Sequence, residues 1–419
     1  MDTIFAESTP PGRGGVSVVR LSGPQARSTV EDLAGPIASA RFAALRALRD
    51  GEDLIDRALV LWFEKDRSFT GEEVAELHVH GAPVILTRLA TALLARGLRR
   101  AEAGEFSRRA FLNGKMDLAE SEGLADLLSA ETEAQRKLAM KAADGELGRK
   151  VARMRANLVR AGALVEASID FADEEVPDEV PDEVFDLVGA VRSEIQDLLR
   201  AYPATERLRQ GYEVAIIGPP NAGKSTLLNR IAQRDIALVS DIAGTTRDVI
   251  ELRTDLRGLP VTFLDTAGIR ESADPVEAMG VARAADRAQS ADLRVHLTEN
   301  GVVPMVVMPG DLVVRSKADL TGGEGLSISA RTGEGVAELL DMVYDILRER
   351  VADSGIVSHK RQAEALQRTN ASLELDAAMS PEVIAEMLRQ AAVSLAEMIG
   401  QVGAEDYLDE IFSSFCIGK

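Results

Sequence analysis

The spacing of apolar positions divides the chain into regions of different structure. Within residues 1–117, short apolar runs predict strands and one helix, namely strands at 16–21, 58–63 and 74–80 and a helix at 83–95. In the last strand the alternation places Glu76, His78 and His80 on one face, together with Val74. We therefore expect residues 1–117 to form an α+β domain.

From Leu118 onward, the apolar spacing becomes that of helices. In one predicted helix, apolar residues recur at intervals of four and three and so form a seam, a row along one face: Leu147, Val151, Met154, Leu158, Ala161 and Val165. A second helix is predicted from about 184 to 201. A third, long helix is predicted from Ile384, Leu388, Ala391, Leu395, Met398 and Val402. Either helical portion alone offers few partners for its seam, so we expect one discontinuous helical domain, made of residues 118–210 and 353–419.

A phosphate-binding motif opens the region between the two helical portions, residues 211–352. The apolar run 213–217 leads into Gly218-Pro-Pro-Asn-Ala-Gly-Lys-Ser-Thr226, and a helix is predicted from near Ser225. In such a loop the backbone N–H groups hold phosphate oxygens. Lys224 supplies a cation to the phosphates, and Ser225 offers its hydroxyl to Mg²⁺.

Three further segments follow in the order of a guanine-nucleotide site. Asp241 to Asp248 is a candidate first switch loop, in which Thr246 completes the Mg²⁺ shell. Asp265-Thr-Ala-Gly268 follows another apolar run and faces the metal and the γ-phosphate. Asp319, in Ser316-Lys-Ala-Asp319, can accept two N–H bonds from guanine, which adenine does not offer, and the segment at Ser329 presents a backbone N–H to the guanine oxygen. The ordered set predicts an inserted Ras-like P-loop GTPase domain in a multidomain α/β protein.

Composition bears on the location of the protein and on the disulfide and metal sites that it could contain. No apolar run approaches the roughly 20 residues of a membrane span, and no basic-then-apolar leader is present, so we expect a cytoplasmic protein. Cys416 is the single cysteine, which excludes an internal disulfide and makes zinc binding improbable. A His-x-His metal site at His78 and His80 is conceivable, although packing or pocket lining is the favoured interpretation.

The formal charge of −20 is unevenly distributed. Residues 1–117 hold 16 basic and 16 acidic residues, which leaves 32 basic and 52 acidic residues for positions 118–419. An acidic body binds RNA poorly on its own. The one obvious basic cluster is either an RNA-binding patch or an ordinary solvated surface, and it comprises Arg99, Arg100, Arg108, Arg109 and Lys115.

Short motifs at both ends and in the middle resemble the tRNA-modification GTPase family MnmE (TrmE). These are Asp2-Thr-Ile-Phe-Ala6, Thr9 to Gly15, Phe69 to Glu73, Gly104-Glu-Phe106, Arg109 to Lys115 and Phe412-Ser-Ser-Phe-Cys-Ile-Gly-Lys419. The resemblance implies GTP hydrolysis coupled to the addition of an aminomethyl or carboxymethylaminomethyl group at carbon 5 of the wobble uridine of tRNA. It also implies a homodimer that forms a heterotetramer with an FAD-containing MnmG (GidA)-like subunit.

The resemblance further assigns cofactor residues. A formyl-tetrahydrofolate species is expected in the first domain, with contacts from Arg20, Glu76, Lys115 and Lys419. Cys416 is either a reactive thiol near that pocket or a small buried hydrophobe. From the motifs and the resemblance together, the predicted GTP contacts are Asn221, Ala222, Gly223, Lys224, Ser225, Thr226, Ser240, Asp241, Ile242, Ala243, Gly244, Thr245, Thr246, Asp265, Thr266, Ala267, Gly268, Ser316, Lys317, Asp319, Ser329 and Ala330.

The expected hydrolytic mechanism differs from that of Ras. Residue 269 is isoleucine, so the water-orienting glutamine of Ras is absent. The resemblance assigns that task to Glu277 and assigns the arginine-finger charge to a potassium ion. Its ligands are implied to be Asn221, Ser240, Ile242 and Thr245, while Ser225 and Thr246 hold Mg²⁺.

Two departures from the usual GTPase pattern carry expectations of their own. Ser316 stands where asparagine normally begins the guanine motif, which predicts weaker nucleotide affinity with guanine selectivity retained through Asp319. The connection 298–311 is too short for a helical crossover, so a helix is expected to be missing there. Two alternative functions stay open: a regulatory GTPase switch, for example in ribosome assembly, and a scaffold whose GTPase is impaired by Ser316.

Overall fold

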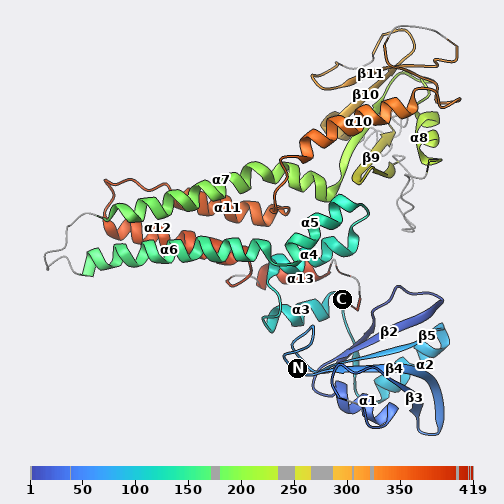
Figure 1. Cartoon of the computed structure of the whole chain (residues 1–419), viewed down its shortest axis with the longest axis vertical. Coiled ribbons are helices and arrows are strands. Elements are labelled where there is room, and N and C mark those ends of the chain that lie inside the picture. Colours follow the sequence, from blue (N-terminus) through green and yellow to red (C-terminus); the bar gives the residue numbers. More distant parts are fainter. Residues whose placement is uncertain are drawn as a thin grey trace, which may run out of the picture. The chain divides into compact units, whose positions relative to one another are not determined.

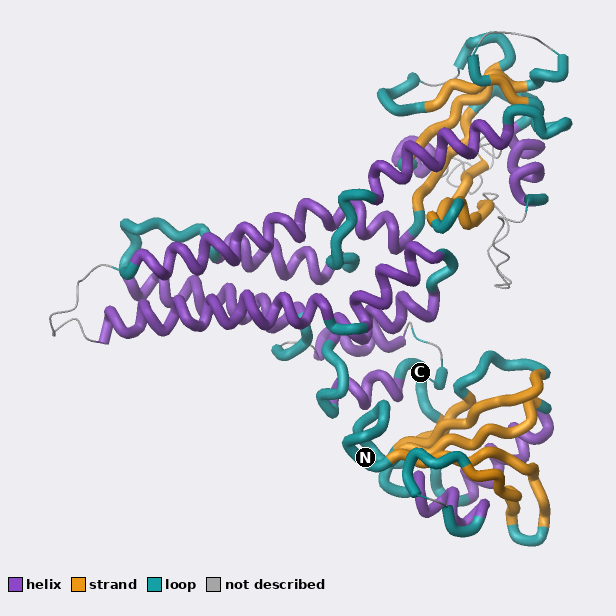
Figure 2. Tube along the Cα trace, viewed as in Figure 1, coloured by secondary structure: helices purple, strands orange, loops and turns teal. Residues whose placement is uncertain are grey.

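The computed structural model describes residues 2–37, 39–170, 180–234, 251–265, 286–303, 306–320, 325–402, 405–413, 415 and 417–418. The chain divides into two compact units. The first comprises residues 1–125, 143–155 and 392–419, and the second comprises residues 126–142 and 156–391. Figure 2 shows that the strands gather in two separate sheets, one in each unit. Among the described residues, no helix has the length and apolar character needed to cross a membrane.

The first unit is built on a six-stranded sheet in the order β3-β4-β5-β2-β1-β6 (Figure 1). Its strands are β1 (Ile4–Glu7), β2 (Gly14–Ser22), β3 (Ala44–Asp50), β4 (Asp53–Phe63), β5 (Val74–Gly81) and β6 (Arg99–Arg100). Helices α1 (Ala26–Ala34) and α2 (Pro83–Ala95) share one apolar core with the sheet. On β5, Ala75, Leu77 and Val79 are buried in that core, which leaves Glu76 and His78 on the opposite face. The predicted strands and helix of this region are confirmed.

The C-terminal segment packs within the first unit. Helix α13 (Glu405–Ser413) lies against α3 (Glu105–Leu112), and Phe412 joins Leu118 and Phe415 in a small core. Gly104 begins α3 at a φ of 65°, where a β-carbon would lie 2.3 Å from the carbonyl oxygen of Phe412. Only glycine permits so close an approach. The last residues then run beside the first strands, because the Ser8 hydroxyl donates to the carbonyl of Gly418 at 3.1 Å.

Long helices follow the N-terminal region, and α7 packs against α11 (Figure 1). Besides α13, the described helices of the two helical portions are α4 (Leu118–Ser129), α5 (Glu133–Ala143), α6 (Glu146–Asp170), α7 (Asp182–Gln210), α11 (Lys360–Ser372) and α12 (Pro381–Met398). All six predicted seam residues of α6 are buried.

Two helix boundaries were predicted wrongly. Helix α7 does not stop near 201 but continues through Pro203 to Gln210. The buried Thr205 donates its hydroxyl to the Ala201 carbonyl at 2.8 Å, which supports the turn after the proline. Helix α12 ends at Met398, and Gly400, with a φ of 76°, follows it, so Val402 is exposed and is not part of the seam.

The GTPase segment forms the second sheet, in the order β12-β11-β10-β7-β9-β8. Its strands are β7 (Tyr212–Ile217), β8 (Glu251–Leu256), β9 (Leu259–Asp265), β10 (Leu293–Thr298), β11 (Leu312–Ser316) and β12 (Ser327–Ile328). Only β8 runs antiparallel to its neighbour; the other pairs are parallel. Helices α8 (Lys224–Ala232) and α10 (Val336–Val351) bury their apolar faces in the same core.

The described part of the connection between β10 and β11 contains no helix. Residues 299–303 and 306–311, the described part of this connection, contain no helical residue. At the end of this connection, Asp311 binds Arg294 at 3.0 Å and the fully buried His296 at 3.0 Å. The expectation of a trimmed GTPase domain is thus confirmed for the described residues.

Candidate functional site

The phosphate loop lies between the end of β7 and the start of α8. Asn221 has a φ of 63° and Gly223 a φ of 95°, so the chain turns sharply before the helix begins at Lys224. The lysine Nζ donates to the carbonyls of Gly218 at 2.8 Å and Pro219 at 3.1 Å. The loop thus folds around the lysine ammonium, and the helix N-terminus adds the partial positive charge that favours phosphate binding.

A hydroxyl and a carboxylate meet beside this loop. The Ser225 Oγ donates to Asp265 Oδ2 at 2.7 Å. The meeting follows from the sheet, since Asp265 ends β9 directly opposite Ile216 of β7. Asp265 is buried, although Ser225 is exposed. Two hard oxygen ligands at the phosphate end of a loop fit Mg²⁺, which binds through one or two protein oxygens together with phosphate and water.

The segments predicted to recognise guanine lie at the same edge of the sheet. Ser316 ends β11 opposite Ile328 of β12, and the N–H of Ala318 donates to the carbonyl of Ile328 at 3.0 Å. Because β7, β10, β11 and β12 are parallel, their carboxyl ends all point to the phosphate-loop edge. Predicted base and phosphate contacts therefore share one edge.

The side chains of the guanine segment differ in their surroundings. The Asp319 side chain is 16% exposed, and its Oδ2 lies 3.7 Å from Arg331 Nε, while Lys317 pairs with Glu299. Ser316 is only 4% exposed, and its hydroxyl has no hydrogen-bond partner among the described residues. The hydroxyl is thus buried without an acceptor of its own, where the usual asparagine would both donate and accept.

The loop after β12 contains the predicted pair Ser329 and Ala330 and is held by a backbone hydrogen bond of its own. Ser329 is buried, and its N–H donates to the carbonyl of Glu334 at 2.9 Å. The Ser329 N–H is therefore used within the loop, and the contact of Ala330 with the guanine oxygen stays a prediction. Arg230 of α8 donates to the Ala330 carbonyl at 3.1 Å, which ties this loop to the helix after the phosphate loop.

Several predicted residues lie outside the described part of the structure. These are Ser240, Asp241, Ile242, Ala243, Gly244, Thr245 and Thr246 of the first switch segment, Thr266, Ala267, Gly268 and Glu277 after β9, and Cys416 and Lys419 at the end of the chain.

A second cluster of candidate residues lies on the open face of the N-terminal sheet. Arg20 of β2 stands directly opposite Glu76 of β5, and its Nε donates to Glu76 Oε1 at 3.0 Å. The guanidinium lies over two aromatic rings, at 5.6 Å from the centre of Phe69 and 5.8 Å from that of Phe106. The role of these aromatic side chains was not predicted, because no local pattern indicates that a loop residue and a helix residue meet over one arginine.

Lys115 approaches this cluster through the same loop. Its Nζ donates to the carbonyl of Asp66 at 2.5 Å, and its side chain packs close to Gly71. Phe69 lies between these two positions in the sequence, so Arg20 and Lys115 both approach the segment 66–71, and Glu76 joins them through its pair with Arg20. His78 lies 3.3 Å from Glu76, whereas His80 binds Asp56 at 2.8 Å. The described residues contain no group of three or more metal-ligating side chains, so the His-x-His metal site gains no support.

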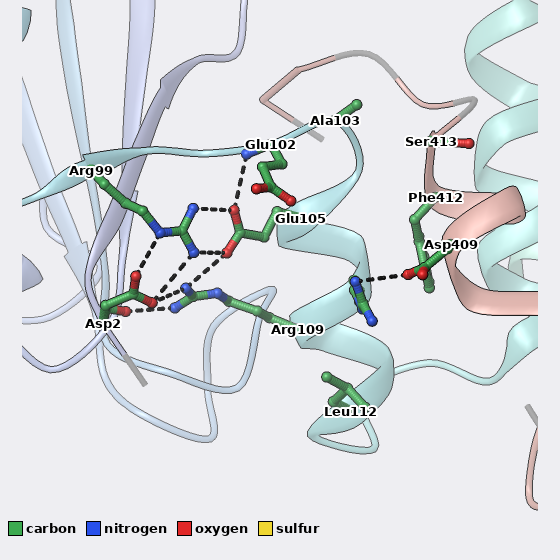
Figure 3. Close-up of a pocket in the computed structure, with 11 residues that line it drawn as sticks. Asp2, Arg99, Glu102, Ala103, Glu105, Arg109, Leu112, Asp409, Phe412 and Ser413 are labelled. Carbon is green, nitrogen blue, oxygen red and sulfur yellow. Dashed lines mark hydrogen bonds and ion pairs between the residues drawn. The ribbon is translucent and has the colours of Figure 1, made fainter. Parts of the chain in front are cut away.

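Two arginines of the basic cluster, Arg99 and Arg109, are paired with acidic side chains. Arg109 is buried and binds Asp2, Glu72 and Glu105 at 2.9 to 3.0 Å. Figure 3 shows that Asp2 and Glu105 also bind Arg99. Burial alone lowers the pKa of Arg109, but hydrogen bonds with Glu72 and Glu105 outweigh it and leave the pKa above its ordinary value. The ion pairs give Arg99 and Arg109 a structural role, whereas the interpretation of the other three residues of the cluster stays a prediction.

These arginines line a cavity within the first unit. Its volume is about 650 Å³, and both acidic and basic side chains line it (Figure 3). Arg108 reaches Asp409 of α13 at 3.1 Å across the cavity, between two exposed side chains. Glu105 has a pKa below its ordinary value: burial raises it, and the bonds from Arg99 and the Glu102 N–H more than compensate.

These features together define a P-loop GTPase. They are a largely parallel sheet, a phosphate loop after β7, an acidic residue at the end of β9 and a predicted guanine segment after β11. Comparison with known proteins gives the family. Residues 3–115 match the model for the GTP-binding protein TrmE N-terminus, and residues 118–416 match the MnmE helical domain. The tRNA modification GTPase MnmE of Paracoccus denitrificans is 76% identical over 419 residues, with 100% of each chain covered.

More distant relatives agree over the full length. The proteins of the same name from Cereibacter sphaeroides and Azorhizobium caulinodans are 49% and 48% identical, covering 100% of this chain and 100% and 99% of their own. The chain belongs to the MnmE family of tRNA modification GTPases. It is thus a GTP hydrolase that acts in tRNA modification, which decides against the regulatory switch and the impaired scaffold.

Proposed function

We propose that this GTPase works with an FAD-containing MnmG-like subunit to install an aminomethyl or carboxymethylaminomethyl group at carbon 5 of the tRNA wobble uridine. The observation that carries the proposal is the pairing of Ser225 with Asp265 beside Lys224. It supports a nucleotide site in which charge, hydroxyl and carboxylate are in place before GTP arrives. Resemblance to the family supplies the chemistry of the uridine.

The oxygen pair supports Mg²⁺ as the metal of the GTP site. Ser225 and Asp265 are the described residues that hold it, directly or through water, with Thr246 completing the shell. The ion neutralises phosphate charge when bound. Lys224 orients the β- and γ-phosphates, and the N–H groups of residues 221–226 fix the phosphate chain.

Potassium is proposed to supply the charge that an arginine finger provides elsewhere. Asn221 is exposed and sits in the turn of the phosphate loop with a positive φ, so its side-chain amide is accessible to an ion beside the phosphates. Its oxygen is a hard ligand of the kind such a cation accepts. Ser240, Ile242 and Thr245 complete the proposed set, and Glu277 positions the attacking water.

The N-terminal cluster is proposed as the binding site of a one-carbon tetrahydrofolate such as 5-formyltetrahydrofolate. Arg20, Lys115 and Lys419 supply positive charge for its carboxylates. Glu76 accepts from the amino group of the pterin. The two rings beside Arg20, Phe69 and Phe106, add flat apolar surface at the same place.

The open face of the same sheet supports a homodimer. Leu45 and Leu59 are exposed cross-strand neighbours, and Leu59 stands opposite His78. Apolar residues in such a row on a solvent-facing sheet are typical of a surface that another chain covers. We propose that two copies pair through this face, that MnmG-like subunits complete a heterotetramer, and that the assembly acts in the cytoplasm.

Nucleoside analysis of tRNA tests the proposed function. Cells that lack this gene are complemented with the unaltered chain, with Lys224→Ala or with Lys137→Ala, an exposed lysine of α5. The unaltered chain and Lys137→Ala are expected to restore the modified wobble uridine, whereas Lys224→Ala leaves it unmodified. Wobble uridine that is fully modified in the deletion strain, or restored by Lys224→Ala, would refute the proposal.

A further inference from the structure

The loop after β12 is a tight turn that is held on one side by its own hydrogen bonds. Gly333 donates its N–H to the Ser329 carbonyl at 2.8 Å, and Thr332 donates its N–H to Ser329 Oγ at 3.1 Å. Because a trans peptide is planar, the Ala330 N–H points in the direction opposite to the Ser329 carbonyl. The turn therefore directs the Ala330 N–H away from Gly333.

Arg230 of α8 binds the next two carbonyls of the same turn. Its Nε donates to the Ala330 carbonyl at 3.1 Å, and its Nη2 donates to the Arg331 carbonyl. The guanidinium passes close to Gly333, where a β-carbon would lie 3.8 Å from Nε. Together with the bond at Ser329, a donor thus holds each of three consecutive carbonyls, two of them through one side chain.

Helix α8 gives this side chain a fixed base. The helix begins at Lys224 in the phosphate loop and buries Leu227, Leu228 and Ile231 in the core of the GTPase sheet. Arg230 lies in its last turn, beside the buried Ile231. One packed helix therefore sets the position of the loop after β12 relative to the phosphate loop.

We propose that Arg230 is a positioning residue for guanine recognition, which holds the turn so that the Ala330 N–H meets the guanine oxygen. The inference rests on the predicted contact between Ala330 and the base, and it names the residue that prepares this contact. The neighbouring Arg331 is less suited to the task, because its side chain is 82% exposed and lies 3.7 Å from Asp319.

Loss of Arg230 leaves the carbonyls of Ala330 and Arg331 to water, so the turn samples other orientations. A guanine nucleotide then binds only the fraction of molecules in which the N–H faces the base, and its apparent affinity falls by that fraction. One hydrogen bond shifts such an equilibrium roughly two- to tenfold, so we expect a loss of about fivefold. A nucleotide without the guanine oxygen should lose nothing.

Isothermal titration calorimetry of the full-length chain with three nucleotides tests this role. GDP is the reference, IDP lacks the 2-amino group but keeps the oxygen, and 6-thio-GDP keeps both N–H donors but carries sulfur, a weak acceptor, in place of the oxygen. Arg230→Ala is expected to bind GDP and IDP about fivefold more weakly and 6-thio-GDP as tightly as the unaltered chain does. Arg230→Lys keeps the charge without the planar fork and should lie between the two.

Arg348→Ala is the matched control. Arg348 lies in α10 of the same domain, is 63% exposed and pairs with Asp345 of its own helix at 3.9 Å, so all three affinities should stay unchanged. Unchanged binding of 6-thio-GDP to Arg230→Ala also shows that the nucleotide site of the variant is folded.

A specific loss of oxygen-containing nucleotides supports the role of Arg230, and two results overturn it. These are an unchanged affinity of Arg230→Ala for GDP and an equal loss for all three nucleotides. If Arg230→Ala binds no nucleotide, Arg230→Lys decides by the same criterion, since a loss confined to GDP and IDP supports the role and any other pattern overturns it. If the unaltered chain binds 6-thio-GDP as tightly as GDP, the predicted base contact and this inference both fall, while the assignment as a GTPase stands.

Discussion

Replacement of Arg109 by methionine tests the network that holds the N-terminal region together. The guanidinium is only 5% exposed and makes four hydrogen bonds. It reaches the Asp2 carbonyl at 2.8 Å, Asp2 Oδ1 at 2.9 Å, Glu72 Oε2 at 3.0 Å and Glu105 Oε1 at 3.0 Å. Methionine keeps much of the volume but removes every donor and the charge.

The expected loss of stability depends on the hydrogen bonds that each acidic partner keeps after the substitution. Removal of one partner from a buried ionic network costs about 3–5 kcal/mol. Glu105 keeps two bonds from Arg99, and Glu72 keeps the Ser22 hydroxyl at 2.7 Å, so neither carboxylate is left without a donor. We therefore expect a loss near the lower limit, about 3 kcal/mol in the free energy of unfolding.

The single tryptophan provides a local assay. Trp62 is buried in β4 within the core of the N-terminal sheet, so its fluorescence reports unfolding of this region in the full-length chain. Urea titration is expected to show a lower midpoint for Arg109→Met. Arg109→Lys, which keeps the charge but loses the planar fork, should fall between the two.

Arg108→Met is the matched control. Arg108 is the next residue in the sequence, but it is 43% exposed and pairs with Asp409, which is 83% exposed. Exposed pairs contribute about 0–1 kcal/mol, so its midpoint should barely change. Equal midpoints for Arg109→Met and Arg108→Met would refute the reasoning that the buried network stabilises this region.

Two further predictions concern Asp117 and Ser316. Burial is the main cause that raises the pKa of Asp117 to about 6; the folded state then holds a proton that the unfolded state releases, so stability falls as pH rises from about 4 to about 6. Asp117→Asn keeps the acceptor for the Glu120 N–H and should be more stable than the unaltered chain at pH 7 by up to about 3 kcal/mol. Urea titrations should show that this difference in the free energy of unfolding vanishes below pH 4. A difference that stays constant with pH would contradict this prediction. Ser316→Asn should strengthen GDP binding about tenfold, measured with a fluorescent nucleotide, and unchanged affinity would show that the buried hydroxyl is not the weak point.

Most of the architecture could be predicted from the sequence, because the spacing of apolar residues and the short motifs determine the helices, strands and loops locally. Strand β7, the turn at Asn221 and the helix from Lys224 are encoded within a few residues, and the short connection after β10 indicated the missing helix. The end of α7 was misjudged because tertiary burial of Leu208 outweighs the local effect of Pro203.

Contacts between distant segments were beyond prediction. Arg109 looked like part of a basic patch because its partners Asp2 and Glu72 lie far away in the sequence. The rings of Phe69 and Phe106 around Arg20 come from a loop and a helix that only the fold brings together. The candidate GTP site was easier to predict from the sequence, because each of its described motifs follows a strand. The carboxyl ends of parallel strands lie at one edge of the sheet.

The central claim is that the phosphate loop supports potassium-stimulated GTP hydrolysis through Asn221. The most direct measurement is the GTPase rate of the full-length chain in potassium and in sodium at equal ionic strength. The unaltered chain and Asn229→Ala, an exposed asparagine of α8, should hydrolyse GTP faster in potassium, whereas Asn221→Ala should be slow in both. Equal rates of the unaltered chain in the two salts, or potassium stimulation that survives in Asn221→Ala, would contradict the claim.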